Sequence, residues 1–244
     1  MKKEIVIWVY SFAIMGLFLI FTSSCKKEND NTDPTPTPTP TPETVADIDG
    51  NVYRTITIGN QVWMAENLKT TKYNDGNSIT LVTDGAVWSN LTTPGYCWDN
   101  NDAATYKNTY GALYNWYAVN TGKLAPTGWH IPTDEEWTTL TTFLGGTSVA
   151  GGKMKSTGTI EAGTGLWYFP NTGATNESGF TVVPAGGRFD AGAFFYIGFS
   201  GFWWSSSEYD TTYAWLRYLN CRSSVVSRSS YYKYYGFSIR CLRD

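Results

Sequence analysis

A run of alternating threonine and proline divides this chain in two. Proline recurs at every second position over one short stretch, at Pro34, Pro36, Pro38, Pro40 and Pro42. Proline lacks the amide donor that strands and helices need and holds the backbone extended, so this stretch cannot enter a packed core. The sequence therefore predicts an extended, disordered Thr-Pro tether over residues 25–46 and a folded domain over residues 47–244. A chain of 244 residues with 42% hydrophobic composition can bury one good core.

The N-terminus has the order of features found in a secretory signal. Lys2 and Lys3 precede an uncharged apolar run over residues 5–21, and small residues follow the run. The run is shorter than the roughly 20 apolar residues that a stable membrane span requires. We therefore expect residues 1–24 to be a signal peptide, with an uncleaved membrane anchor as the alternative.

Cys25 follows Ser23 and Ser24 directly, an arrangement that resembles a bacterial lipobox. The resemblance implies cleavage before Cys25 and lipidation of Cys25, although Thr22 stands where an aliphatic residue is usual. We expect a protein of the cell envelope that is lipid-anchored in the outer membrane and exposed at the cell surface. The tether would hold the head away from the membrane, outside the cytoplasm, where disulfides persist.

Few residues suggest nucleic-acid binding, metal chemistry or catalysis. The net charge is −3, so no global basic field attracts nucleic acid, and we expect a monomeric head without a nucleic-acid partner. His130 is the only histidine and has no second metal ligand or nucleophile beside it, so we expect a hydrogen-bonded structural residue and no catalytic site. Asp99, Asn100, Asn101 and Asp102 offer four consecutive oxygen ligands for calcium, but such clusters more often make turns, so no cofactor is expected.

Local patterns predict a mixed set of short elements. Residues 51–58 and 61–64 form a hairpin around Gly59 and Asn60, and the apolar spacing of residues 110–119 predicts a helix. A second helix begins after Thr133, which forms a capping box with Glu136, and buries Trp137, Leu140 and Leu144. Short strands are expected over residues 180–184, 193–198, 201–205, 213–217 and 235–242. We also expect a bulge or a strand end near residues 217–219, and we expect residues 220–234 to contain a solvent-exposed loop.

The stretch from Trp203 to Tyr235 is rich in tyrosine and serine, with tryptophan and arginine between them. Serine is a weak strand former, so this is not the composition of a purely structural strand pair. Tyrosine and tryptophan supply stiff contact area, serine supplies adaptable hydrogen bonds, and arginine is enriched at binding hot spots. The stretch predicts a recognition surface, with an aromatic-rich sheet bearing a solvated face as the alternative. The candidate ligand-binding residues are Tyr209, Asp210, Tyr213, Trp215, Arg217, Tyr218, Asn220, Arg222, Ser223, Ser224, Arg228, Tyr231, Tyr232, Tyr234 and Tyr235.

Several segments in order resemble the Fibrobacter succinogenes major paralogous domain of bacterial lipoproteins. They read DGNVYRTITIGNQVWMAENL, YCWDNND, YGALYNWYAV, GWHIPTDEEW, SGFTVVPAGGR, FWWSSSE and GFSIRCLRD, and they are spread in order over nearly the whole range of residues 47–244. The resemblance implies an α+β domain with a C-type-lectin-like fold, in which two helices pack on short mixed and antiparallel strands with many loops. The family's biochemical activity is poorly defined, so the resemblance informs the fold more than the function.

A second resemblance concerns the C-terminus, which is similar to variable proteins of diversity-generating retroelements. Adenine-directed mutation of Asn codons yields Tyr, Ser, Asn, Asp, Arg, Val and Cys, which are abundant over residues 209–235, whereas Trp215 and Lys233 would not arise in this way. Cys97 and Cys241 lie in the family-like segments and Cys221 lies in the variable stretch. We therefore expect a Cys97–Cys241 disulfide, with a Cys221–Cys241 bridge as the alternative.

The leading hypothesis is a cell-surface lipoprotein whose head binds a protein or glycan ligand through the C-terminal surface. One alternative is a structural or adhesive surface subunit without a discrete ligand. A remote alternative is an oxidase similar to formylglycine-generating enzymes, which share the lectin-like fold and resemble this chain in its GF-R-C ending. That chemistry requires two neighbouring redox cysteines, for which Cys221 and Cys241 are the candidate pair.

Overall fold

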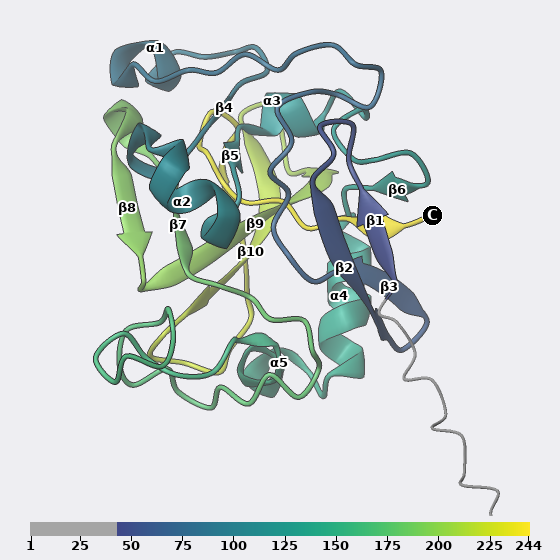
Figure 1. The fold of residues 1–244 in the computed structure, drawn as a ribbon, viewed down its shortest axis with the longest axis vertical. Helices are drawn as coiled ribbons and strands as arrows, with labels where there is room; N and C mark the ends of the chain where they lie inside the picture. Colours follow the sequence, from purple (N-terminus) through teal and green to yellow (C-terminus); the bar gives the residue numbers. More distant parts are fainter. Residues whose placement is uncertain (1–42) are drawn as a thin grey trace, which may run out of the picture. The chain divides into compact units, whose positions relative to one another are not determined.

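The computed structural model describes residues 43–244, and Figure 1 shows their fold. The predicted signal peptide, Cys25 and most of the predicted tether lie outside these residues. The sequence predicts a tether through residue 46, but Thr44–Ala46 form β1, which pairs with β2. The folded domain therefore begins a few residues earlier than expected. No helix within residues 43–244 is long and apolar enough to cross a membrane.

One five-stranded antiparallel sheet joins the two ends of the domain, in the order β1-β2-β3-β12-β6. The predicted hairpin is confirmed as β2 (Val52–Ile58) and β3 (Gln61–Met64), with Gly59 in the turn at a φ of 62°. β12 (Leu242–Arg243) lies between β3 and β6 (Trp129–His130). The last residues of the chain therefore lie in the same sheet as the first described ones, and Figure 1 shows the C-terminus beside β1.

The described helices are short, and the longest begins as predicted. In α4 (Asp134–Phe143) the Thr133 hydroxyl accepts a hydrogen bond from the Glu136 amide, and the Glu136 carboxylate accepts one from the Thr133 amide. Trp137, Leu140 and Leu144 are buried, as the spacing predicts. The other helices are α1 (Gly85–Ser89), α2 (Ala103–Tyr110), α3 (Trp116–Val119) and α5 (Thr147–Met154), with 3-10 turns η1 (Asp99–Asn101) and η2 (Asp190–Gly192).

The prediction of one helix over residues 110–119 is wrong. α2 ends at Tyr110 because Gly111 adopts a φ of 79°, and a Cβ there would lie 2.8 Å from Asn67 Cβ and from the Leu68 carbonyl oxygen. The chain then forms β5 (Leu113–Tyr114) against β4 (Tyr96–Cys97) before α3 begins. The buried character of the segment was predicted correctly, but contacts with a distant segment break the helix.

A second five-stranded sheet carries the C-terminal stretch, in the order β11-β10-β9-β7-β8. All its neighbours are antiparallel except β7 and β9, which are parallel and meet at Gly186 and Gly201. Figure 1 shows β8 on the side of the domain opposite β1 and β2. The strands are β7 (Ala185–Arg188), β8 (Phe194–Ile197), β9 (Ser200–Glu208), β10 (Tyr213–Asn220) and β11 (Ser227–Tyr232).

The predictions in this region are confirmed in part. The segment 220–234 contains a loop at residues 221–226, and most of its remainder forms β11, which pairs with β10. The bulge lies in β9, where residues 205–207 face Trp215 alone, whereas β10 itself ends at Asn220, close to the predicted strand end. Residues 180–184 and 235–241 form only isolated bridges instead of strands, although Phe237, Ile239 and Cys241 point inward as expected.

Buried cations fasten the irregular segments to the core. Arg240 donates to the carbonyls of Met64, Phe180 and Thr181 at 2.8–3.1 Å, and burial lowers its pKa to about 9. Lys155 donates to three carbonyls, at 2.9–3.2 Å, and burial lowers its pKa to about 8. Such buried donors satisfy backbone oxygens that no strand pairs.

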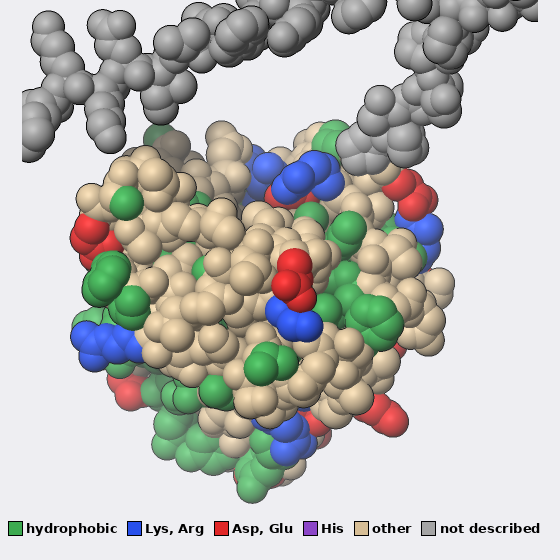
Figure 2. All heavy atoms as spheres, turned by 90° about the horizontal axis from the view of Figure 1, so that it is seen from below, with side chains coloured by type: hydrophobic (Ala, Val, Ile, Leu, Met, Phe, Trp, Pro, Cys, Tyr) green, Lys and Arg blue, Asp and Glu red, His purple; other side chains and the backbone are tan. Residues whose placement is uncertain are grey.

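The end of the domain near α5 presents mainly backbone and uncharged polar side chains (Figure 2).

Candidate functional site

The predicted recognition residues lie on and around the β10–β11 pair, but they divide into three places. The register pairs Tyr213 with Tyr232, Trp215 with Ser230 and Arg217 with Arg228, so these side chains share one face. Tyr231 and Tyr218 point to the opposite face. The loop after β10 carries Asn220, Arg222, Ser223 and Ser224 at the other end of the strand from Tyr213.

The first face is built around one indole ring. The Arg228 guanidinium carbon lies 3.3 Å from the centroid of the Trp215 ring, and Tyr209 meets the same ring edge-on at 4.7 Å. Tyr209 is 53% exposed and Trp215 is half-buried, so the cluster is in reach of solvent. We call Tyr209, Tyr213, Trp215, Arg228, Ser230 and Tyr232 the Trp215 face.

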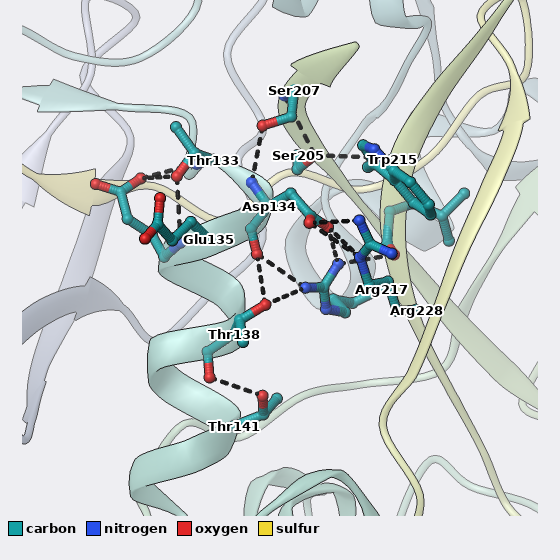
Figure 3. Close-up of polar contacts among 12 residues, drawn as sticks. Thr133, Asp134, Glu135, Thr138, Thr141, Ser205, Ser207, Trp215, Arg217 and Arg228 are labelled. Carbon is teal, nitrogen blue, oxygen red and sulfur yellow. Dashed lines mark hydrogen bonds and ion pairs between the residues drawn. The ribbon is translucent and has the colours of Figure 1, made fainter. Parts of the chain in front are cut away.

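An aspartate at the start of α4 fixes both arginines of this region (Figure 3). Arg228 Nε donates to the two Asp134 carboxylate oxygens at 3.0 and 2.9 Å, and Arg217 Nη1 donates to Oδ1 at 2.5 Å. Burial alone would raise the pKa of Asp134, but the hydrogen bonds from Arg228 and Arg217 hold this pKa below its usual value. Asp134 therefore stays ionised and orients the guanidinium group over Trp215.

Tyrosine rings continue the Trp215 face toward the end of β11. The rings of Tyr213 and Tyr232 are 4.6 Å apart, and those of Tyr232 and Tyr234 stack at 5.2 Å. Tyr234 donates its hydroxyl to Asp190 Oδ1 at 2.7 Å. These half-buried rings hold one another in place, so they offer contact area that loses little conformational freedom on binding.

Two predicted contact residues are part of the core. Arg217 is 2% exposed, and its Nη2 also donates to the Asp134 carbonyl and the Thr138 hydroxyl. Both of its terminal nitrogens therefore have partners in α4. Tyr235 is 5% exposed and packs against Phe189 and Phe237. These two side chains are not available to a ligand, because α4 covers Arg217 and aromatic rings pack against Tyr235.

The remaining predicted residues have local roles. Asp210 accepts hydrogen bonds from the amides of Thr212 and Tyr213 and closes the β9–β10 turn. Tyr218 stacks on Phe202 with ring centroids 5.7 Å apart. In the loop after β10, Asn220 accepts from the Arg222 amide and Ser224 donates to the Thr172 carbonyl, while exposed Arg222 lies over Phe199. This loop lies apart from the Trp215 face.

A pocket of about 240 Å³, which the sequence did not predict, lies on the opposite face of the β10–β11 pair. Its lining combines β11 with residues from β7 to β8, where Phe195 and Tyr196 are more than half exposed. A possible signal was present: two adjacent large rings in a strand cannot both face a core on one side. The lining residues are Phe189, Asp190, Phe195, Tyr196, Tyr231 and Tyr235.

The predicted disulfide is wrong. Cys97, Cys221 and Cys241 are free, buried thiols in three different hydrophobic clusters. Burial raises the pKa of the Cys97 thiol to about 12 and also raises that of Cys241, so both are protonated and unreactive at neutral pH. Both residues lie in family-like segments and both are buried, but they lie in different clusters of the core.

The two other sequence candidates have structural partners. His130 contacts the Asp244 carboxylate through Nδ1 at 2.7 Å and the Glu136 carboxylate through Nε2 at 3.1 Å, which confirms a hydrogen-bonded structural residue. Asp102 caps α2 through the Thr105 amide, and Asn101 donates to the Thr83 carbonyl. Within residues 43–244, no group of three or more His, Cys, Asp or Glu side chains is placed to hold a metal ion.

Comparison with known proteins identifies one family. The model of the Fibrobacter succinogenes major domain matches residues 56–243, from β2 to the last strand. Neither a curated protein nor a solved structure matches the chain. Because the match covers most of the first sheet, the whole second sheet and all the described helices, the chain belongs to the Fibrobacter succinogenes major domain family.

Proposed function

We propose that this protein is a lipid-anchored cell-surface lipoprotein whose head binds a protein or glycan ligand through the Trp215 face. The observation that carries the proposal is the stacked Arg228–Trp215–Tyr209 group, which Asp134 orients from α4. Preoriented rings and a guanidinium group lose little entropy on binding. Such rings stack on the apolar faces of sugars or fill protein hot spots, and the arginine donates hydrogen bonds.

The proposal includes a C-type-lectin-like fold for the head. The α+β composition, the short strands, the pair of helices α4 and α5 and the long connecting segments support it. β1 and β12 belong to one sheet, with β2 and β3 between them, and an ion pair between Arg243 and Glu43 joins the ends of the domain. A tethered head built in this way leaves the strands of its second sheet available for recognition.

The two alternatives differ in what they require. A structural or adhesive subunit needs no preoriented surface group, so the Trp215 face gives it no support. An oxidase requires neighbouring thiols, and Cys221 and Cys241 lie in separate core clusters. The binding hypothesis is therefore the one that uses a specific arrangement of the described residues.

Glycan arrays and arrays of purified extracellular proteins, probed with the full chain, test the proposal. We expect saturable binding that falls at least tenfold in Trp215→Ser and in Arg228→Ala, because each removes a hot-spot side chain worth about 2 kcal/mol. Phe143→Ala is the control, since Phe143 is an aromatic ring on α4 that lies outside the Trp215 face and is 63% exposed. Binding that survives both substitutions, or no saturable binding on either array, would leave the structural alternative.

We further propose that the Trp215 face is diversified by adenine-directed mutation. Tyr209, Tyr213, Arg228, Ser230 and Tyr232 are all residue types that this process produces, and all contribute to the face. The flanking DNA should contain an imperfect copy of the codons for residues 209–235 that differs at adenines. The proposal of diversification fails if sequencing of the locus finds no such copy, whereas ligand binding by a fixed surface would be unaffected.

A further inference from the structure

The open pocket on the other face of the β10–β11 pair is lined mainly by aromatic rings. Phe189, which is 9% exposed, lies among the rings of the other four aromatic residues. Its centroid is 5.2 Å from Tyr235, 5.4 Å from Tyr196, 6.2 Å from Phe195 and 6.5 Å from Tyr231. The contacts with Tyr196 and Tyr231 are nearly perpendicular, so the rings form walls around Phe189 and do not stack into a flat layer.

Backbone strain keeps two of these rings on the same side. Phe195 and Tyr196 are adjacent in β8, and adjacent strand residues normally point to opposite faces. Tyr196 has a φ of 70°, a conformation that bulky residues rarely adopt and that costs about 1–3 kcal/mol. Both side chains consequently line the pocket, with ring centroids 6.0 Å apart. Core packing does not explain this strain, because Phe195 and Tyr196 remain 53% and 51% exposed.

The pocket carries one negative charge without a cation beside it. Asp190 accepts a hydrogen bond from Tyr234 and forms no ion pair with any residue in the range 43–244. Nearby Arg188 directs its donors to the carbonyls of Gly192, Val82 and Thr83. Burial and the bond to Asp190 raise the pKa of Tyr234 to about 12, so its hydroxyl stays neutral.

Protein cations cover aromatic rings elsewhere in this domain but not here. Described lysine and arginine side chains lie over ten rings, including those of Trp215, Trp116 and Phe180. None of these ten rings is among the five that line the pocket. The exposed rings of Phe195 and Tyr196 and the exposed Asp190 carboxylate are therefore both available to a cation from outside.

We propose that this pocket binds the quaternary ammonium group of a small organic cation. A primary ammonium group would need three acceptors, whereas a quaternary one has no N–H to satisfy and is bound by ring faces. The volume of about 240 Å³ is below the roughly 300–1,000 Å³ of pockets for drug-sized ligands, so it suits one head group. Asp190 at the rim adds the attraction of opposite charge.

Titration of the full chain in detergent with choline, followed by calorimetry, tests this site. We expect saturable binding with a dissociation constant of about 1 mM or tighter, the range that a few cation–π contacts supply. The uncharged isostere 3,3-dimethylbutan-1-ol has the same shape and should bind at least tenfold more weakly. Phosphocholine and trimethyllysine, compared with choline, distinguish the possible sources of the ammonium group.

Variants separate a cation site from a general apolar pocket. Asp190→Asn keeps the acceptor for Tyr234 and should weaken choline binding several-fold without changing binding of the neutral isostere. Phe195→Ala and Tyr196→Gly remove exposed rings and should each weaken choline binding about tenfold. Phe143→Ala and Trp215→Ser, which lie outside the pocket, should have no effect. Equal affinity for choline and its isostere, or no saturation up to about 50 mM, would overturn the proposal; failure of the Trp215 face to bind a ligand would not.

Discussion

Arg217 and Arg228 are the same residue type in the same stretch of sequence, yet they do different things. Both contact Asp134, but Arg217 is buried under α4 and Arg228 lies over Trp215 with 45% of its side chain exposed. Composition cannot separate them, because the difference comes from the α4 N-terminus about eighty residues away in the sequence. One carboxylate thus joins a core contact to a surface contact.

The role of Asp134 predicts a pH-dependent stability. Asp134→Asn leaves Arg217 buried without a counter-charge, so the free energy of unfolding at pH 7 should fall by about 3 kcal/mol. The folded-state pKa of Asp134 lies below its unfolded value of 3.8. Its contribution is therefore complete above about pH 4 and is lost as the pH falls through the lower, folded-state pKa. Between pH 7 and pH 3, the free energy of unfolding measured with urea should therefore fall less for Asp134→Asn than for the natural chain.

Asp102→Asn is the matched control for this prediction. Asp102 also has a lowered pKa, through hydrogen bonds from the Thr105 side chain and amide, but it is exposed and has no cation beside it. Asparagine is an equally good helix cap, so the change at pH 7 should stay within about 0.5 kcal/mol. If the stability of Asp134→Asn and of the natural chain fell in parallel between pH 7 and pH 3, the Asp134 ion pairs would not be the titrating contact.

At the scale of elements, the sequence correctly predicted those helices and strands whose position depends on residues nearby in the chain. The hairpin of β2 and β3 depends on its own turn, and the start of α4 depends on Thr133 and Glu136. The segment 235–241 is different. Its inward residues were predicted from alternation, but its carbonyls accept from Leu68, Tyr114 and Trp204, which belong to different parts of the domain. A segment that bonds to elements on both sides cannot be distinguished from a strand by its own pattern.

The same limit applies to the candidate site. The Trp215 face was predicted from tyrosine, serine and arginine content, because rings and guanidinium groups favour recognition wherever the strands place them. The pocket was missed because Phe195 and Tyr196 fit a short strand, and because the residue pattern does not show the positive φ at Tyr196. Arg217 and Tyr235 were assigned to the surface because composition does not show what covers a side chain: α4 covers Arg217, and Phe189 and Phe237 pack against Tyr235.

At the scale of the whole molecule, the first described strand and the proposed binding surfaces belong to different sheets. β1, the first described strand, and β12, the last, belong to the sheet that ends in β6. The Trp215 face and the aromatic pocket belong to the other sheet, whose strand β8 lies on the opposite side of the domain in Figure 1. A chain held by its N-terminal end would therefore present β8 and its neighbours away from the point of attachment.

This arrangement would present β8 away from the membrane only if the N-terminal end is anchored, and substitution of Cys25 tests the anchor. Cys25→Ser removes the sulfur that would carry the lipid, so the chain should lose incorporation of labelled palmitate and move from the membrane fraction to the soluble fraction. Thr22→Leu is the matched control, since it restores the aliphatic residue usual in a lipobox and should keep the chain membrane-bound and lipidated. A Cys25→Ser chain that remained in the membrane fraction without palmitate would instead favour an uncleaved apolar anchor over residues 5–21. Both outcomes tether the head by the same end, but only the first makes Cys25 the point of attachment.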